Sequence, residues 1–173
     1  MERIKWFNRN FNFSSNQNIF PAVIERLSGT PARLEEKFKN IPEEHLTKKV
    51  DNTWTIKENA GHLTDLEPLW LGWLNEILDG KKELSPADPD NTKTKTANHN
   101  EVPADELLEG FRKSRKNTVA VLEGLNEKQI FLSAVHPRLK IQMKTMDLFK
   151  FVAEHDDHHL ARITELLKTI NQP

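Results

Sequence analysis

The sequence predicts an all-α protein, a four-helix bundle with long crossover connections, formed by a single domain over residues 1–173. Apolar residues recur three and four positions apart in separate stretches, which is the spacing that gives a helix one apolar face. Clusters of proline, glycine, asparagine and aspartate divide these stretches. Two of the dividing segments are long, and long connections let a chain cross a bundle instead of turning straight back.

The first helical stretch is interrupted by a turn signal. Residues 19–28 and 31–39 both have apolar residues at helical spacing, and they form one broken helix or two helices. Thr30 is a candidate N-cap for the second part, and Pro31 follows at the first helical position, where its missing N–H leaves no hydrogen bond unmade. Together the two parts count as one of the four bundle helices.

The second helix has a clear start. Residues 55–58, TIKE, have the form of a capping box, in which the Thr55 hydroxyl and the Glu58 carboxylate each satisfy a backbone N–H that the first turn leaves free. The helical pattern runs from this box to about Asp79, and Gly80 ends it. We therefore place the second bundle helix between Thr55 and Asp79.

Two further helices are expected in the second half of the chain. Residues 80–103 contain three prolines and no apolar period, so they are expected to form a long surface connection. A third helix follows over about 104–125. Its apolar side comprises Leu107, Leu108, Phe111, Val119 and Leu122. Residues 126–144 allow a short extended piece but predict no definite strand, and Thr145 is expected to cap a final helix that runs to about Ile170.

The composition excludes several classes of function. With 25 basic and 26 acidic residues the net charge is −1, and no basic stripe indicates a nucleic-acid partner. No apolar run approaches the roughly 18 residues that span a bilayer, and the start of the chain is too polar for a signal peptide, so we expect no membrane partner and a cytoplasmic protein. Cysteine and tyrosine are absent, so a bound metal ion would be held by imidazole or carboxylate groups.

Residues 151–163, FVAEHDDHHLARI, place three histidines on different sides of the last helix. At about 100° per residue, His155 and His159 lie roughly 40° apart, in the sector that also carries the apolar residues of this helix. That sector contains Leu148, Val152, Ile163, Leu166 and Ile170. His158 lies about 60° to the other side of His155, among polar residues. We therefore expect His155 and His159, but not His158, to face the core.

A third inward histidine is expected on the second helix. His62 shares its apolar stripe with Leu66, Trp70, Trp73 and Ile77. Buried imidazoles need partners for their polar nitrogens. Three neutral imidazoles, two from one helix and one from a facing helix, can hold a divalent ion at about 2.0–2.1 Å and leave another coordination position open. We therefore take His62, His155 and His159 as candidate metal ligands.

Simpler interpretations stay open for these residues. A single inward histidine is more often a hydrogen-bonded core residue than a metal ligand. His45, His99 and His136 fall in predicted loops, where a plain surface role is favoured. Trp70 and Trp73 fit core positions better than a substrate platform.

Three stretches of the sequence resemble the DinB/YfiT-like superfamily of metalloenzymes, and its DinB-like branch in particular. They are RLSGTPARLEEKF, NTWTIKENAGHLTDLEPLW and HPRLKIQMKTMDLFKFVAEHDDHHLARI, and the resemblance extends over roughly residues 24–170. The most specific parts are Trp54 before the capped helix with GHLTD, and the EHDDHH segment. In that family one histidine of the second helix and two of the fourth bind a divalent metal, commonly nickel or zinc. The resemblance implies these roles for His62, His155 and His159.

The residues and the resemblance favour a metal-dependent enzyme. Known activities in the family include transfer and isomerisation reactions with low-molecular-weight thiols, and the resemblance implies no DNA chemistry. A bound ion would lower the pKa of a water molecule or of a small-molecule thiol and make it a nucleophile near neutral pH. We therefore expect a hydrolase or a thiol S-transferase with a small-molecule substrate. Asp65 and Glu58, one turn after and before His62, are candidate catalytic residues that would orient an imidazole or act as a base, although both also fit a solvated helix face.

Two other classes of protein fit the same residues. The first is a non-catalytic bundle that a structural ion stabilises and that binds a ligand or a protein partner, as a closed shell of four ligands would indicate. The second is a metal-free interaction bundle in which the imidazoles find other partners. A homodimer is also expected, because Phe149, Phe151 and Leu160 are apolar residues outside the histidine sector. The pair His136 and Pro137 looks like another feature of the DinB-like branch; we assign it no firm role, and His136 is at most a pocket residue.

Overall fold

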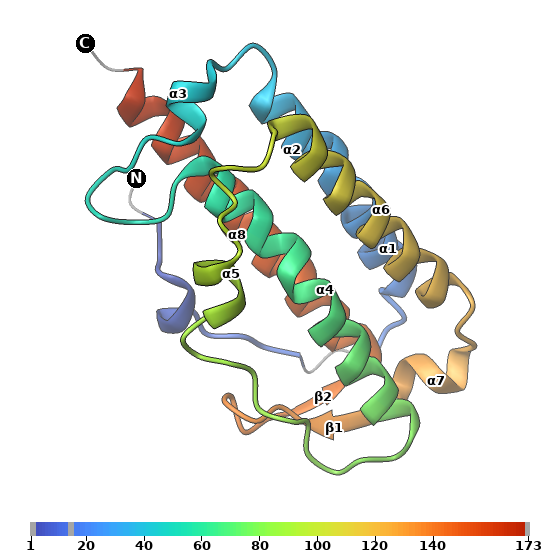
Figure 1. Cartoon of the computed structure of the whole chain (residues 1–173). Helices are drawn as coiled ribbons and strands as arrows, with labels where there is room; N and C mark the ends of the chain where they lie inside the picture. The colour runs from blue at the N-terminus through green and yellow to red at the C-terminus, as the bar shows by residue number, and fades with distance from the viewer. Residues whose placement is uncertain (1–2, 14–15, 172–173) are drawn as a thin grey trace.

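The computed structural model describes residues 3–13 and 16–171, and its long helices lie side by side as a four-helix bundle (Figure 1). The bundle helices are α1 (Phe20–Ser28), α2 (Thr30–Phe38), α4 (Ile56–Leu78), α6 (Ala104–Glu123) and α8 (Thr145–Ile170). α1 and α2 follow one another and pack against α6 and α8, the same two helices that α4 contacts. The pair α1 and α2 therefore acts as one member of the bundle. The predicted all-α fold class is confirmed.

The start and the end of α4 follow the sequence signals. The Glu58 N–H donates to the Thr55 hydroxyl over 3.1 Å, and the Thr55 N–H donates to the Glu58 carboxylate over 2.7 Å, so the predicted capping box is present. After the helix, Gly80 has a φ of 78°, a left-handed conformation that glycine adopts at low cost. The box and the glycine thus set the limits of the helix that carries His62.

The other two predicted N-caps are wrong by one residue. Thr30 is the first residue of α2, and its hydroxyl donates to Asp156 of α8 over 2.9 Å instead of capping a backbone N–H of its own helix. Thr145 is the first residue of α8, and the N–H of the residue before it donates to Asp147 over 3.1 Å. Contacts with other segments therefore decide what these two threonines do.

The connections hold short elements that the sequence pattern does not predict. β1 (Ser133–Val135) and β2 (Gln142–Lys144) form an antiparallel hairpin in which Ala134 pairs with Met143. Three residues in each strand are too few to show an alternating pattern, which is why no strand is expected there. The other short elements are η1 (Trp6–Asn8), α3 (Glu43–Leu46), α5 (Thr92–Thr96) and α7 (Glu127–Phe131).

The long connection between α4 and α6, predicted to lie on the surface, is partly buried. Leu84 is 2% exposed, and its N–H donates to the Val135 carbonyl of the hairpin over 3.0 Å. The indole N–H of Trp73 donates to the Ser85 carbonyl over 2.8 Å. Thr94, in α5, is 4% exposed. The connection therefore packs back onto α4 and the hairpin, where its polar groups find partners.

The apolar residues of α8 are buried within the single chain. Phe149, Phe151 and Leu160 are 0%, 3% and 5% exposed, and they pack in the core. They form no exposed patch, so the reason for expecting a dimer is wrong, and the dimer itself stays a prediction. Among the described residues, no helix combines the length and the apolar composition that crossing a membrane requires.

A buried ionic network joins three bundle helices. Arg115 of α6 is 1% exposed and lies between Glu67 of α4 and Asp156 of α8. Its Nε donates to Glu67 over 2.8 Å, and its Nη2 donates to Asp156 over 3.1 Å. The hydroxyls of Thr30 and Thr118 donate to Asp156 and Glu67 respectively. Each buried charge therefore has both a counter-charge and hydrogen bonds, as burial of ions requires.

Candidate metal centre

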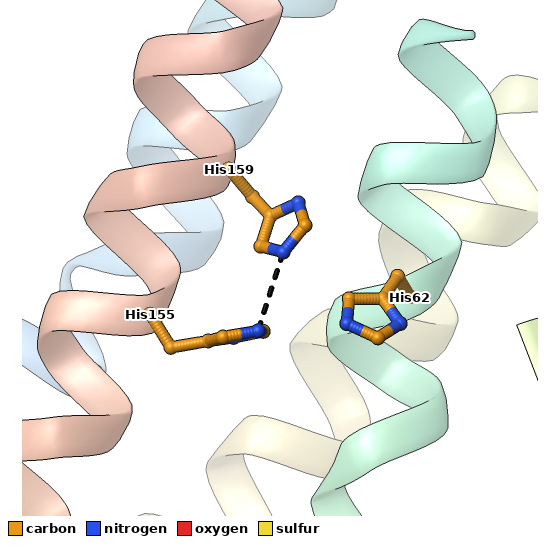
Figure 2. Close-up of side chains that lie close together, drawn as sticks. All are labelled: His62, His155 and His159. Carbon is orange, nitrogen blue, oxygen red and sulfur yellow. Dashed lines mark hydrogen bonds between the residues drawn. The ribbon is translucent and has the colours of Figure 1, made fainter. Parts of the chain in front are cut away.

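The three predicted histidines converge between α4 and α8 (Figure 2). His62 projects from α4, and His155 and His159 project toward it from successive turns of α8. The three rings can each offer one nitrogen such that these atoms lie within 4.8 Å of one another. The side chains are 3%, 5% and 7% exposed. The predicted meeting of these rings in the core is confirmed.

A chain of hydrogen bonds orients His62. Its Nδ1 lies 2.9 Å from the Thr94 hydroxyl, and that hydroxyl donates to Asp65 over 2.8 Å. Because the only hydroxyl proton goes to Asp65, the Thr94 oxygen accepts a hydrogen bond from Nδ1–H of His62. The Nε2 atom of His62 then has a free lone pair, which is what a metal ligand needs.

Asp65 is held from the other side by His99. The His99 Nε2 lies 2.8 Å from the Asp65 carboxylate, and the two side chains are 11% and 7% exposed. The His99 ring lies so close to Gly61 that a Cβ atom there would come within 2.3 Å of it. Burial raises the pKa of Asp65, but hydrogen bonds from His99 and Thr94 outweigh burial and lower the pKa in total. The surface role expected for His99 is therefore wrong, because this ring packs against α4.

Asn59 orients His159 in the same way. The His159 Nδ1 lies 2.9 Å from the Asn59 side-chain oxygen. The Asn59 amide nitrogen donates to the carbonyls of Thr55 and Trp54 over 2.8 and 3.2 Å, which turns the amide oxygen toward the histidine. Since that oxygen only accepts, the proton of His159 lies on Nδ1, and its Nε2 carries a lone pair that faces His155.

The third ring, His155, leaves hydrogen-bonding capacity unmet. Its Nε2 lies 3.2 Å from the Nε2 of His159, and its Nδ1 has no hydrogen-bond partner among the described residues. Nitrogen ligands at about 2.0–2.1 Å from one ion lie roughly 2.9–3.4 Å apart when they occupy neighbouring positions. The observed Nε2 separation falls in this range, so His155 and His159 fit neighbouring positions on a divalent transition-metal ion.

Burial keeps the three imidazoles neutral at neutral pH. It lowers the pKa of His62 from the usual 6.5 to about 4. It lowers the pKa values of His155 and His159 well below 6.5, and the neighbouring imidazoles add to the effect. Because a neutral imidazole is the form that binds a metal ion, no proton has to leave these ligands first.

A cavity of about 450 Å³ opens onto the three histidines. Trp54 forms part of its wall, with a ring centroid 4.7 Å from that of His62. The N-terminal segment forms another part. Trp6 packs edge-on against His155 with ring centroids 5.0 Å apart, and Arg3 lies 3.0 Å from the ring of His158. Figure 1 shows this blue segment on the same side of the bundle as α5.

A second cavity, of about 280 Å³, also has His155 in its wall. Trp70 and Trp73 line it, although both are core residues as predicted. His136 lines it too and is 3% exposed. The His136 Nδ1 accepts two backbone N–H groups of the hairpin turn over 3.1 and 3.2 Å, and burial lowers the pKa of this ring to about 4. The surface role expected for His136 is therefore wrong.

The remaining candidates lie at different places. The Glu58 carboxylate is engaged in the cap of α4 and lies 3.8 Å from Lys49. His158 lies on the flank of α8, as predicted, where it is partly buried beside Arg3. Asn59 and Thr94 support the site but were not predicted. Asn59 is three residues before His62, so helical spacing places both on one face of α4 and could have indicated its role. Thr94 comes from a connection without apolar periodicity, which gives no such indication.

The fold and the site together define a class of protein, an all-α bundle with three buried histidines that could hold a metal ion. The sequence model of the DinB superfamily matches residues 26–163, so the chain belongs to this superfamily. YfiT from Bacillus subtilis, described as a probable metal-dependent hydrolase with an unusual four-helix bundle topology, has a similar structure. Its TM-score is 0.81 at 19% sequence identity, with 96% of each chain covered.

A second solved structure, a protein from Streptococcus pneumoniae, is also similar in fold. The TM-score is 0.67 at 16% identity, and the match covers 91% of this chain and 94% of the other. A comparison with curated proteins finds no match. At these levels of identity the two structural matches establish the fold of the chain.

Proposed function

We propose that the chain is a metal-dependent enzyme in which His62, His155 and His159 hold a divalent ion, nickel or zinc. The ion would activate a water molecule or a small-molecule thiol, so the protein would be a hydrolase or a thiol S-transferase. One observation carries this proposal: three buried, neutral imidazoles converge, and hydrogen bonds that Nδ1–H donates in His62 and His159 leave the Nε2 lone pairs of these two rings for an ion. Membership of the DinB superfamily and the likeness to YfiT support it.

The residues around the histidines have separate tasks in this proposal. Three protein ligands leave at least one coordination position for water or substrate, and the cavity of about 450 Å³ gives access to it. Asp65 holds His62 through Thr94, and Asn59 holds His159, so both act as positioning residues. That Asp65 or Glu58 acts as a base stays a prediction.

A thiol, if one takes part, comes from a second substrate. The chain contains no cysteine, so it cannot supply a sulfur nucleophile of its own. A low-molecular-weight thiol could reach the histidines through the same cavity as water. Imidazole ligands suit both nickel and zinc, and the supply of each ion during expression would decide which one is bound.

The metal content of single variants tests the ligand assignment. His62→Ala, His155→Ala and His159→Ala should each lower divalent-ion occupancy strongly in protein made without a histidine tag, because two imidazoles hold an ion much less well than three. His158→Ala should keep full occupancy, since this ring lies on the flank of the helix. Elemental analysis that finds full metal in His155→Ala, or loss of metal in His158→Ala alone, would refute the assignment.

Activity assays then separate an enzyme from a bundle that an ion merely stabilises. The metal-loaded protein should hydrolyse members of an ester and amide panel, or join a low-molecular-weight thiol to a thiol-reactive electrophile. A chelator should abolish the activity, and zinc or nickel should restore it. A protein that binds the ion fully but turns over none of these compounds would favour the non-catalytic alternative.

A further inference from the structure

The cavity over the three histidines has a cationic wall. It includes Arg3, Lys5 and Arg162, and no aspartate or glutamate among the described residues lines it. Glu165 lies beside this wall, accepting from Arg3 over 3.1 Å and from Arg162 over 3.2 Å. One carboxylate therefore balances only part of the charge of three cationic side chains.

Two of these cations are held in place. The Arg162 Nη2 donates to the Thr53 hydroxyl over 2.7 Å, and the Arg3 Nη1 lies 3.0 Å from the ring of His158. Both arginine side chains are 22% exposed, so water screens them less than it screens a free surface cation. A guanidinium held in this way is a prepared partner for an oxyanion, because its N–H groups match carboxylate geometry.

Metal binding would make this cavity more positive still. The three imidazoles are neutral, so they would leave both charges of a divalent ion uncompensated. A cavity lined by one sign of charge concentrates ligands of the opposite sign. The cationic wall and the proposed ion thus act on a ligand in the same direction.

We infer that the ligand of this cavity is an organic anion, whose acidic group binds at Arg3 and Arg162 while its reacting group lies at the three histidines. This inference rests on the proposed function, because it names the class of small molecule that the metal site takes. It also assigns a role in ligand binding to the segment before α1, because Arg3 and Lys5 belong to this segment. These residues would select the ligand without taking part in the chemistry.

Two thiols that differ only in charge test the inference. 3-Mercaptopropionate and 3-mercaptopropionamide have nearly the same size, and either thiolate would give a charge-transfer absorption band on cobalt-substituted protein. Titration followed through this band measures Kd without turnover. The acid should bind roughly tenfold more tightly than the amide at low ionic strength, and added salt should reduce the difference.

Substitutions at the wall should remove this preference. Arg3→Gln and Arg162→Gln should each lower it severalfold, and Arg3→Lys should keep part of it because the charge remains. Lys128→Gln is the matched control, since this exposed lysine of α7 lies outside the cavity and its loss changes the net charge equally. The control should bind both thiols as the unmodified protein does.

The possible outcomes separate this inference from the proposed function. Equal binding of acid and amide, an unchanged preference in both glutamine variants, or cobalt protein that gives no band with either thiol would overturn the inference while the metal site stands. Failure of cobalt to bind at all would overturn the proposed function, and the inference with it.

Discussion

Replacing Thr94 with valine would remove one hydroxyl group from the hydrogen bonds that orient His62. Valine keeps the branched shape of threonine, so the substitution replaces the hydroxyl with a methyl group and changes the shape of the side chain little. In the native protein the hydroxyl lies 2.9 Å from the His62 Nδ1 and donates to Asp65 over 2.8 Å. In the variant, the His62 Nδ1–H would be buried without an acceptor, and Asp65 would keep His99 as its close donor.

The effect on the metal Kd depends on whether the metal-bound or the metal-free protein is destabilised more by loss of this hydrogen bond. A buried N–H without a partner costs roughly 1–3 kcal/mol. An ion on Nε2 would withdraw electrons from the ring and make Nδ1–H of His62 a stronger donor, so the bound state would lose more. Loss of such a partner behind a ligating histidine weakens metal binding by about 10–100-fold, which corresponds to roughly 1.4–2.7 kcal/mol. We expect the metal Kd of Thr94→Val to rise by this factor.

A competitive titration against a chromophoric zinc chelator measures this Kd. Thr96→Val is the control, because Thr96 lies in the same short helix, is exposed, and donates only to backbone carbonyls of α5. Its metal Kd should match that of the unmodified protein. A Thr94→Val protein that binds zinc within about twofold of the unmodified protein would refute the reasoning that Thr94 supports His62.

Two further predictions concern the stability of the metal-free protein. Lowering the pH from 7 to 5 should cost about 2 kcal/mol through His62 alone, because its pKa is 6.5 in the unfolded chain and about 4 in the fold, so only the unfolded state gains a proton in this range. Urea unfolding that gives equal stability at both values would contradict this. Arg115→Met should cost about 3–5 kcal/mol, since it leaves Glu67 and Asp156 buried without a counter-charge. Arg112→Met, at an exposed position of the same helix, should leave the urea midpoint nearly unchanged.

The bundle and the histidine cluster could be predicted because both depend on local spacing. His155 and His159 are four residues apart, so helical geometry alone places them on one face. The capping box at Thr55 marks where α4 begins and which of its residues, His62 among them, face the core. No knowledge of distant contacts is needed for either step.

Supporting residues outside α4 could not be predicted, because their burial depends on segments far away in the sequence. Thr94 and His99 come from a connection without periodicity, and only the approach of that connection to Asp65 makes them part of the site. Arg115 is of a residue type that is usually exposed, and two carboxylates from other helices are what allow its burial. Trp6 lies in the three-residue 3-10 helix η1, which is too short for any pattern.

The buried charges of Arg115, Glu67 and Asp156 set the position of α4 along the axis of α8. Glu67 follows His62 by five residues on α4, and Asp156 follows His155 by one on α8. Any shift of one helix along the other would therefore displace the carboxylates and the histidines by the same distance. A slide of one helical turn, about 5.4 Å, would leave charges unpaired in the core. Metal–ligand distances tolerate deviations of only about 0.2 Å. The alignment at which the three imidazoles meet is therefore determined by buried charges that lie outside the histidine cluster.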